Sequence, residues 1–208
     1  MSRKTEEFGK ELNLIGDAER RLFVSRCLEN VADYFFEVPA SSTGKYHPAY
    51  SLGRGGLVRH TKAAVHIADD LLRLDMFSSL LPIKDAIISA LILHDTCKSG
   101  RHGFENHGFT MSTHPLIACD LIKACANDAA AEGERPGPIN GVDYCDLVCD
   151  LISTHMGQWR EDYKSKKTVL PEMKTKEQKF VHLCDYLASR KDITVTNEDG
   201  TPLESLYV

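Results

Sequence analysis

The sequence has little of several features that mark common classes of protein. Its 208 residues include a single tryptophan, only 8% are aromatic, and the formal net charge is −5. No apolar stretch approaches the roughly 18 residues of a membrane span, and the N-terminus is too polar for a signal peptide. We therefore expect a cytoplasmic protein with no transmembrane helix and no membrane partner.

The sequence also has no continuous basic segment. Lys and Arg cluster only between positions 160 and 179, where acidic residues are interleaved with them. Proteins that bind long nucleic acid usually present a basic face. The charge pattern disfavours an extended nucleic-acid partner and allows a small phosphorylated substrate such as a nucleotide. It leaves the oligomeric state open.

Cysteines are present but do not form the pattern of a zinc finger. The seven cysteines are scattered, and the pair Cys145 and Cys149 has no second pair at finger spacing after it. Most of them fall in apolar helical patterns, where cysteine behaves as a small hydrophobic residue. We expect buried free thiols in a reducing compartment.

Helical periodicity is the feature that the sequence does have. Apolar residues recur at helical spacing in segments 17–38, 57–74, 82–94, 116–128, 142–156 and 174–191. A chain of this length buries roughly 70% of its unfolded surface and needs no crosslinks to hold a core. The pattern predicts an all-α protein, a compact bundle over residues 17–191, with tails at 1–16 and 192–208. A short β-hairpin around Asp199 and Gly200 is an option in the second tail.

Several predicted helices carry a His or Asp on the apolar face or at its end, namely His60, His94, His155 and Asp185. Asp95 follows His94 directly, and adjacent helical side chains point about 100° apart, so both of them need partners. Each residue alone has an ordinary explanation as a hydrogen-bonded core residue. Burying all of them without partners would be costly. Because imidazole and carboxylate groups are ligands of catalytic metals, the combination predicts a metal site.

These residues follow the H…HD…D signature of the HD-domain metal-dependent phosphohydrolase superfamily, which the sequence resembles in a series of motifs. The motifs are GGLVRHT at 55–61, ALILHDTCK at 90–98, THPLIACDLI at 113–122, LISTHMGQW at 151–159 and VHLCDYLASR at 181–190. The resemblance covers about residues 37–191. It implies an HD-type helical bundle.

The resemblance also implies one or two divalent ions per chain, held by the residues that match the family's ligands: His60, His94, Asp95, His114, His155 and Asp185. In members with two ions the HD aspartate, here Asp95, bridges them. Such ions lie about 3.5–4 Å apart, and a metal-bound hydroxide attacks the phosphorus. The sequence does not distinguish Mn, Fe, Mg, Ni, Co and Zn. For His114, a helix-entry residue before a proline is the alternative interpretation.

The catalytic candidates are Asp95 and Lys98. Lys98 stands one turn beyond Asp95, and the resemblance implies that it stabilises charge on the phosphate. The alternative is a lysine that interacts only with a helix C-terminus. Further candidates for substrate contact lie in two loops rich in Gly or His: His47, Arg54, His102 and His107. For His102 and His107, solvent exposure or competition with His114 for the metal are the alternatives.

The function that the resemblance implies is hydrolysis of a phosphoester of a nucleotide or short oligonucleotide. Residues 39–61 are also similar to the entry loop of bacterial HD-domain 3′-to-5′ exoribonucleases. Tyr46-His47 stands where those enzymes have two histidines, and the sequence shows no counterpart of their OB-type domain. Their substrate is therefore not carried over. Three alternatives remain open: a 3′-to-5′ exonuclease on longer nucleic acid, a di-iron oxygenase of the HD fold, and a non-catalytic nucleotide sensor.

Overall fold

The computed structural model describes residues 2–41, 43–101, 103, 110–193, 195–196 and 201. Within these residues it is helical and has no β-strand beyond the isolated bridges Ile139–Val142 and Glu161–Thr168. The all-α prediction is confirmed. The α-helices are α1 (Arg3–Glu7), α2 (Gly9–Leu12), α3 (Ala18–Glu29), α4 (Gly56–Leu72), α5 (Lys84–Leu93), α6 (His114–Ala131), α7 (Tyr144–Ser153) and α8 (Lys176–Ala188). The 3₁₀ helices are η1 (Asp33–Phe36), η2 (Ala49–Ser51) and η3 (Asp75–Ile83).

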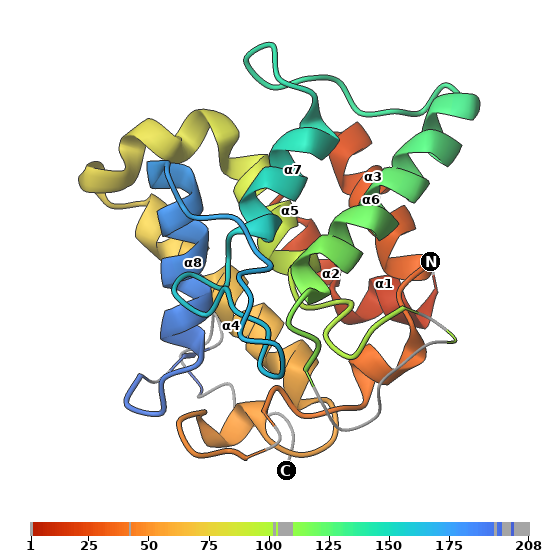
Figure 1. Ribbon diagram of the computed structural model, residues 1–208. Helices are drawn as coiled ribbons and strands as arrows, with labels where there is room; N and C mark the ends of the chain where they lie inside the picture. The colour runs from red at the N-terminus through yellow and green to blue at the C-terminus, as the bar shows by residue number, and fades with distance from the viewer. Residues whose placement is uncertain are drawn as a thin grey trace.

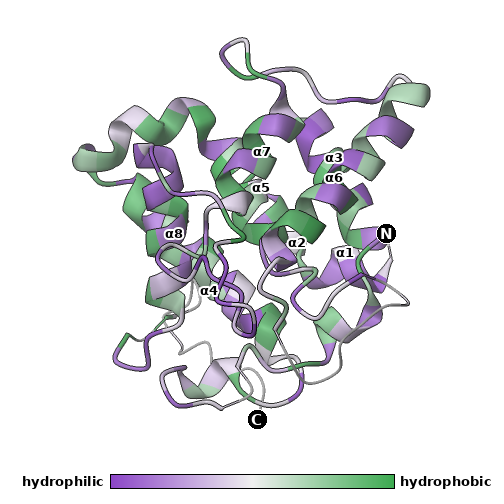
Figure 2. Ribbon diagram, viewed as in Figure 1, coloured by the Kyte–Doolittle hydropathy of each residue, from purple (hydrophilic) through white to green (hydrophobic). Residues whose placement is uncertain are grey.

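Helix α5 forms the centre of the bundle (Figure 1). Residues 86–93 are all buried, because the helix packs against α3, α4, α7 and α8. Helices α4 and α8 pack together on one side, and α6 packs against α7 and α3 on the other. Figure 2 shows hydrophobic residues where these helices face the interior and mostly hydrophilic ones in the loop that follows α7. The residues that directly follow α5 therefore lie inside the molecule.

Residues Asp75–Leu93 form a 19-residue stretch that could cross a membrane by length and composition, with 50% of it buried in the molecule. The expectation that no apolar stretch approaches this length was wrong. The stretch joins η3 to α5 and includes Pro82. A core helix of a soluble protein passes the same test, and packing around α5 accounts for the apolar composition.

The N-terminal segment differs from the expected tail at residues 1–16. Residues 3–12 form α1 and α2, and the side chains of Phe8, Leu12 and Ile15 belong to the hydrophobic core. Phe8 stands between the two helices and Ile15 lies beyond α2, so no single helix carries the three residues. The short segments give no continuous apolar pattern in the sequence. The hairpin option near residue 200 lies outside the described residues.

The first predicted helix is shorter than expected. Asp17 caps α3, since its side chain accepts a hydrogen bond from the Arg20 backbone N–H. The helix ends at Glu29, where the Asn30 side chain donates to the Arg26 carbonyl. Ala32 is then extended, and η1 follows as a separate turn. All seven cysteines are buried free thiols, as expected.

Candidate metal centre

The candidate ligands come from separate helices that meet beside the end of α5. His60 lies in the second turn of α4 and Asp185 near the end of α8, whereas the other four stand at or just beyond helix ends: His94 and Asp95 after α5, His114 at the start of α6, and His155 after α7. Because α5 packs against α4, α7 and α8, and α7 packs against α6, the structure brings all six together. Their donor atoms form three overlapping groups, each within 4.8 Å.

One half of the centre gathers around the carboxylate of Asp185. The Nε2 atom of His60 lies 2.9 Å from Asp185 Oδ1, and that of His94 lies 3.5 Å from the same oxygen. Asp95 Oδ2 lies 3.6 Å from His94 Nε2 and 3.9 Å from His60 Nε2. Two imidazoles and two carboxylates thus surround one point.

The other half gathers around the second oxygen of Asp95. Asp95 Oδ1 lies 2.9 Å from His114 Nε2 and 3.8 Å from His155 Nε2. The two Nε2 atoms are 3.2 Å apart. Asp95 therefore presents one oxygen to each half, which is the position required of a bridging ligand.

Three of the imidazoles are oriented by the backbone. The Nδ1 atoms of His94, His114 and His155 each lie 2.7–2.8 Å from the carbonyl oxygen of the residue three positions earlier. Because a carbonyl only accepts, Nδ1 carries the proton and Nε2 presents its lone pair to the centre. This is the tautomer that a ligating imidazole needs.

Two buried ring nitrogens test whether a metal fits the centre. His94 Nε2 has no hydrogen-bond partner among the described residues, although its side chain is fully buried. A bound cation would satisfy this atom, and the mixed set of imidazole nitrogens and carboxylate oxygens suits divalent transition metals. His60 Nδ1 likewise has no partner among the described residues. His60 is thus the one imidazole whose outer nitrogen is not held by a carbonyl.

The charges at the centre shift the pKa values of its acids downward. Burial alone would raise the pKa of Asp95, but the Lys98 ammonium and the adjacent imidazoles hold it well below the ordinary value. Burial would also raise the pKa of Asp185, but the hydrogen bond from His60 and the nearby ring of His94 outweigh it and hold the pKa well below the ordinary value. Both carboxyl groups are therefore ionised at neutral pH and available as ligands.

The two deepest imidazoles shift in opposite directions. Burial lowers the pKa of His155 to about 3, and the nearby rings of His94 and His114 add to this effect. Burial also acts to lower the pKa of His94, but the carboxylates of Asp95 and Asp185 more than compensate and raise it. In the absence of a metal, a proton on His94 is thus the favoured counter-charge for the two acids.

Lys98 contacts the centre directly. Its Nζ atom donates to Asp95 Oδ2 across 2.6 Å, and its side chain is mostly buried. The residue lies five positions beyond the end of α5, and its ammonium group donates to this side-chain carboxylate. The contact places a fixed cation next to the candidate metal ligands.

The four candidates for substrate contact divide into three groups. The ring of His47 lies 6.0 Å from that of His60, and burial together with the nearby charges lowers its pKa to about 4. His102 and His107 lie outside the described residues. Arg54 is not among the residues that surround the ligands.

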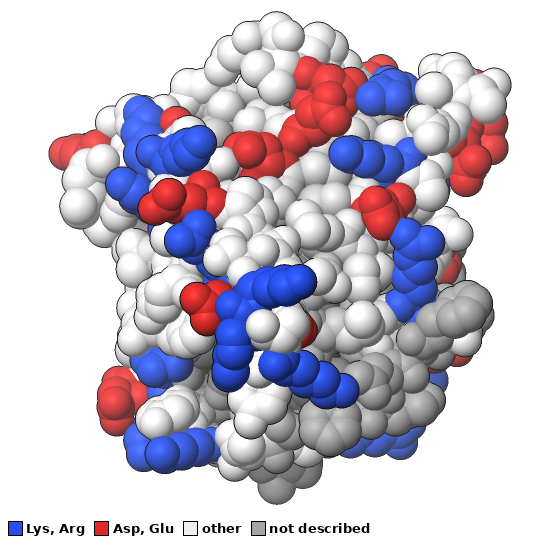
Figure 3. Space-filling view, in the orientation of Figure 1, with Lys and Arg blue, Asp and Glu red and all other residues white. Residues whose placement is uncertain are grey.

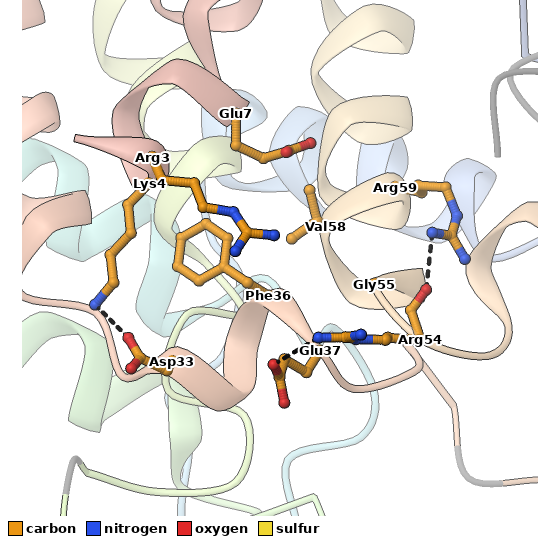
Figure 4. Close-up of a pocket in the computed structure, with 10 residues that line it drawn as sticks. All are labelled: Arg3, Lys4, Glu7, Asp33, Phe36, Glu37, Arg54, Gly55, Val58 and Arg59. Carbon is orange, nitrogen blue, oxygen red and sulfur yellow. Dashed lines mark hydrogen bonds and ion pairs between the residues drawn. The ribbon is translucent and has the colours of Figure 1, made fainter. Parts of the chain in front are cut away.

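Arg54 lines a separate cavity of about 520 Å³ between α1, η1 and the start of α4 (Figure 4). Its guanidinium pairs with Glu37 at 3.0 Å, and its side chain is 79% exposed. None of the six candidate ligands lines this cavity. The expected role of Arg54 in substrate contact therefore stays a prediction, and no candidate metal ligand lines the same cavity to support it.

His182 and Gly157 support the centre and were not singled out in the sequence. His182 Nδ1 donates to the His155 carbonyl across 2.6 Å, and the His182 ring lies against Gly157. Any side chain at Gly157 would overlap this ring, and the residue also has a positive φ of 60°. The glycine of the THMGQW segment was the available signal.

Comparisons with known proteins agree with this geometry. The family model described as HD domain matches residues 57–190, which include all six candidate ligands. No curated protein and no solved structure gives a significant match to the chain.

Proposed function

The chain belongs to the HD domain family, and we propose that it is a phosphohydrolase that cleaves a phosphoester of a nucleotide or short oligonucleotide. HD domains bind divalent metals and are generally hydrolytic, and the His/Asp cluster of this chain can hold such ions. One observation carries the proposal. Four Nε2 atoms and two carboxylates from neighbouring helices converge, and the fully buried Nε2 atom of His94 has no hydrogen-bond partner among the described residues.

Within this proposal, the chain's own residues divide the work. The six ligands hold one or two ions, with Asp95 shared because its two oxygens face different halves of the centre. When bound, divalent ions activate water and neutralise charge on phosphoryl oxygens. The rings of His94, His114 and His155 are held by backbone carbonyls, so the ligands need no reorganisation when an ion enters.

Lys98 and His47 would act on the substrate. Lys98 already lies 2.6 Å from Asp95, so a phosphate bound at the centre comes within reach of its ammonium group. His47 has a pKa of about 4 and is neutral at pH 7, so it can exchange hydrogen bonds with a phosphate or sugar hydroxyl without adding charge. The low exposure of the metal ligands keeps bulk water away from the place where the phosphate would bind.

A small substrate is favoured by charge. The net charge of −5 would repel a long polyanion over most of the surface, whereas local cations near Lys98 can bind one or a few phosphates. We therefore expect turnover of mononucleotides or short oligonucleotides to exceed degradation of long RNA or DNA.

The test is a screen of phosphorylated metabolites, nucleotides and short oligonucleotides with each divalent metal added in turn. We expect phosphate or nucleotide release that chelation abolishes and that Asp95→Asn eliminates. Two results would refute the proposal. One is a wild-type protein in which elemental analysis finds no metal, and the other is an Asp95→Asn variant that releases product as fast as the wild type. Oxygen consumption by an iron-loaded protein would replace it with the oxygenase alternative.

A further inference from the structure

Four side chains from three segments form a continuous stack beside the metal centre. We call Tyr46, Arg190, Tyr186 and Trp159 the stacking ladder. The Trp159 and Tyr186 rings are nearly parallel, at 17°, with centroids 6.0 Å apart. The Arg190 guanidinium lies 4.4 Å from the centroid of Tyr186 and 5.7 Å from that of Tyr46, so it is layered between the two tyrosines.

The ladder is anchored to the candidate ligands at several points. Tyr186 directly follows Asp185 on α8, and Tyr46 directly precedes His47. At the other end, the Trp159 ring lies 6.2 Å from that of His182, which in turn donates to the carbonyl of His155. These connections place the stack beside Asp185, whose side chain, with 18% exposure, is the most accessible of the six ligands.

The two ends of the ladder are open to solvent. Trp159 is 49% exposed and Tyr46 is 54% exposed, although their neighbours in the stack are partly covered. A single exposed aromatic residue is ordinary, but here two of them end one stack beside the candidate metal ligands. The exposed area at the two ends of the stack is available to a flat ligand.

Cations surround the ladder. Lys45 lies 5.0 Å from the centroid of Tyr46, and the loop that carries Trp159 also carries exposed lysines at positions 164, 166 and 167. None of these lysines forms an ion pair with another residue of the described ranges. Figure 3 shows Lys and Arg side chains gathered on the viewed face where this loop crosses the molecule in Figure 1. The Ser112 hydroxyl donates to Asp162 and ties the loop to the segment just before His114.

We propose that the stacking ladder binds the nucleobase of the substrate while its phosphate occupies the metal centre. The inference rests on the proposed function, because it assumes that the centre takes a phosphate. Flat aromatic and guanidinium faces next to cations suit a ligand that combines a base with phosphates, since every base has a π-face that stacks on them. A phosphorylated sugar without a base would leave the ladder unused.

The first experiment uses Trp159 as a built-in probe, because it is the only tryptophan of the chain. The full-length wild-type protein is titrated with nucleoside monophosphates and with ribose 5-phosphate, and stopped-flow recording captures the binding response before any turnover. We expect saturable quenching of tryptophan fluorescence by the nucleotides and none by ribose 5-phosphate, after correction with free N-acetyltryptophanamide. Equal responses to both ligands, or a nucleotide response no larger than the correction, would overturn the inference.

The second experiment measures base discrimination by calorimetry, as the ratio of the Kd for ribose 5-phosphate to that for the nucleotide. Trp159→Leu and Tyr186→Leu should each lower this ratio by roughly 5- to 100-fold, the range expected for one lost stacking partner. Tyr163→Leu is the matched control, because Tyr163 is 81% exposed on the same loop but stacks only with Lys166. If Tyr163→Leu lowers this ratio as much as Trp159→Leu does, the inference is overturned. Thermal melting identifies any variant that has lost its fold.

The two proposals fail in different ways. Nucleotides that quench Trp159 but are never cleaved with any metal would leave the ladder in place and remove the hydrolase. Nucleotides and ribose 5-phosphate that are cleaved with equal kcat/KM, without a response from Trp159, would leave the hydrolase in place and remove the ladder.

Discussion

Two groups of charged side chains surround the first two turns of α4, and they differ in how their charges are matched. In the cavity of Figure 4, Lys4 pairs with Asp33 at 2.7 Å and Arg54 pairs with Glu37 at 3.0 Å. At the metal centre, both carboxylates have close partners, but the buried His94 Nε2 has no hydrogen-bond partner among the described residues. Apart from Arg3, the charged side chains that line the cavity have partners among the described residues.

This difference shows which property identifies a reactive site. Exposed ion pairs such as Arg54–Glu37 contribute about 0–1 kcal/mol and persist without a ligand. A buried polar atom without a partner costs about 1–3 kcal/mol, and the fold tolerates it where a ligand supplies the partner. A buried ring nitrogen without a hydrogen-bond partner among the described residues, rather than the presence of a cavity, therefore marks the centre around Asp95.

The largest effect that tests this comparison is expected at Asp95. Asp95→Asn removes the charge shared by both halves of the centre, so we expect loss of both ions and a fall in kcat/KM of about 10³-fold or more. Elemental analysis and steady-state kinetics measure the two effects. His155→Ala is the matched variant, because His155 Nε2 lies near Oδ1 of Asp95, the oxygen that also faces His114, and the variant should lose about one ion. Retention of both ions by Asp95→Asn would contradict the bridging assignment.

A smaller effect is expected at Lys98, whose ammonium contacts the centre without belonging to the ligand set. Lys98→Ala should lower kcat/KM by about 10²-fold while leaving the metal content nearly unchanged, because the lost interaction is with charge on the phosphate. A lysine that only stabilises a helix end would change stability by about 0.3–1 kcal/mol and turnover very little. Full activity in Lys98→Ala would support that second interpretation.

The metal-free protein should lose stability as pH falls from 6.5 toward 4.5. The pKa of His155 is about 3 and that of His47 about 4 in the folded chain, so below pH 6.5 the unfolded chain takes up protons that the folded chain does not. His94, whose pKa is raised, is protonated in both states over this window and does not oppose the loss. We expect the Tm of chelated protein to fall by roughly 5 °C, and His155→Gln to reduce the fall. A Tm that stays constant between pH 6.5 and 4.5 would contradict the assigned protonation states.

The smallest effect is expected in the other charged group. Arg54→Ala removes an exposed ion pair in a cavity that none of the six ligands lines, so kcat/KM should change less than about twofold and stability by at most about 1 kcal/mol. Kinetics and thermal melting on this variant complete the comparison. A loss as large as that of Lys98→Ala would place Arg54 in the substrate site and remove the distinction between the two groups.

The sequence predicted those site residues whose pattern lies within a single segment, and it did not predict positions that depend on tertiary contacts. His60, His94 and Asp185 stand in helical patterns that their own segments reveal, and the HD dipeptide at the end of an apolar run is visible without any tertiary contact. The position of Arg54 was not predictable in this way, because the entry loop turns it toward Glu37. The two halves of the centre likewise depend on which oxygen of Asp95 faces which helix.

The rest of the fold shows the same limit. Phe8, Leu12 and Ile15 enter the core through contacts with distant helices, and the short segments that carry them give no continuous apolar pattern. The stacking ladder joins the loop after α7, the end of α8 and the entry loop, so no single segment contains it. The spacing of Tyr186 and Arg190, four residues apart, was the only local sign.

The carbonyl contacts of His94, His114 and His155 have a consequence for how such a protein can change over time. Each ring is aimed by the main chain of its own helix end, so the ligands do not depend on the identity of the side chains around the opening. Substitutions in the entry loop, the loop after α7 or the ladder can therefore alter which molecule is admitted without dismantling the reactive core. The architecture separates a conservative interior from an adjustable entrance, and new substrate preferences can arise at the entrance at little risk to the chemistry.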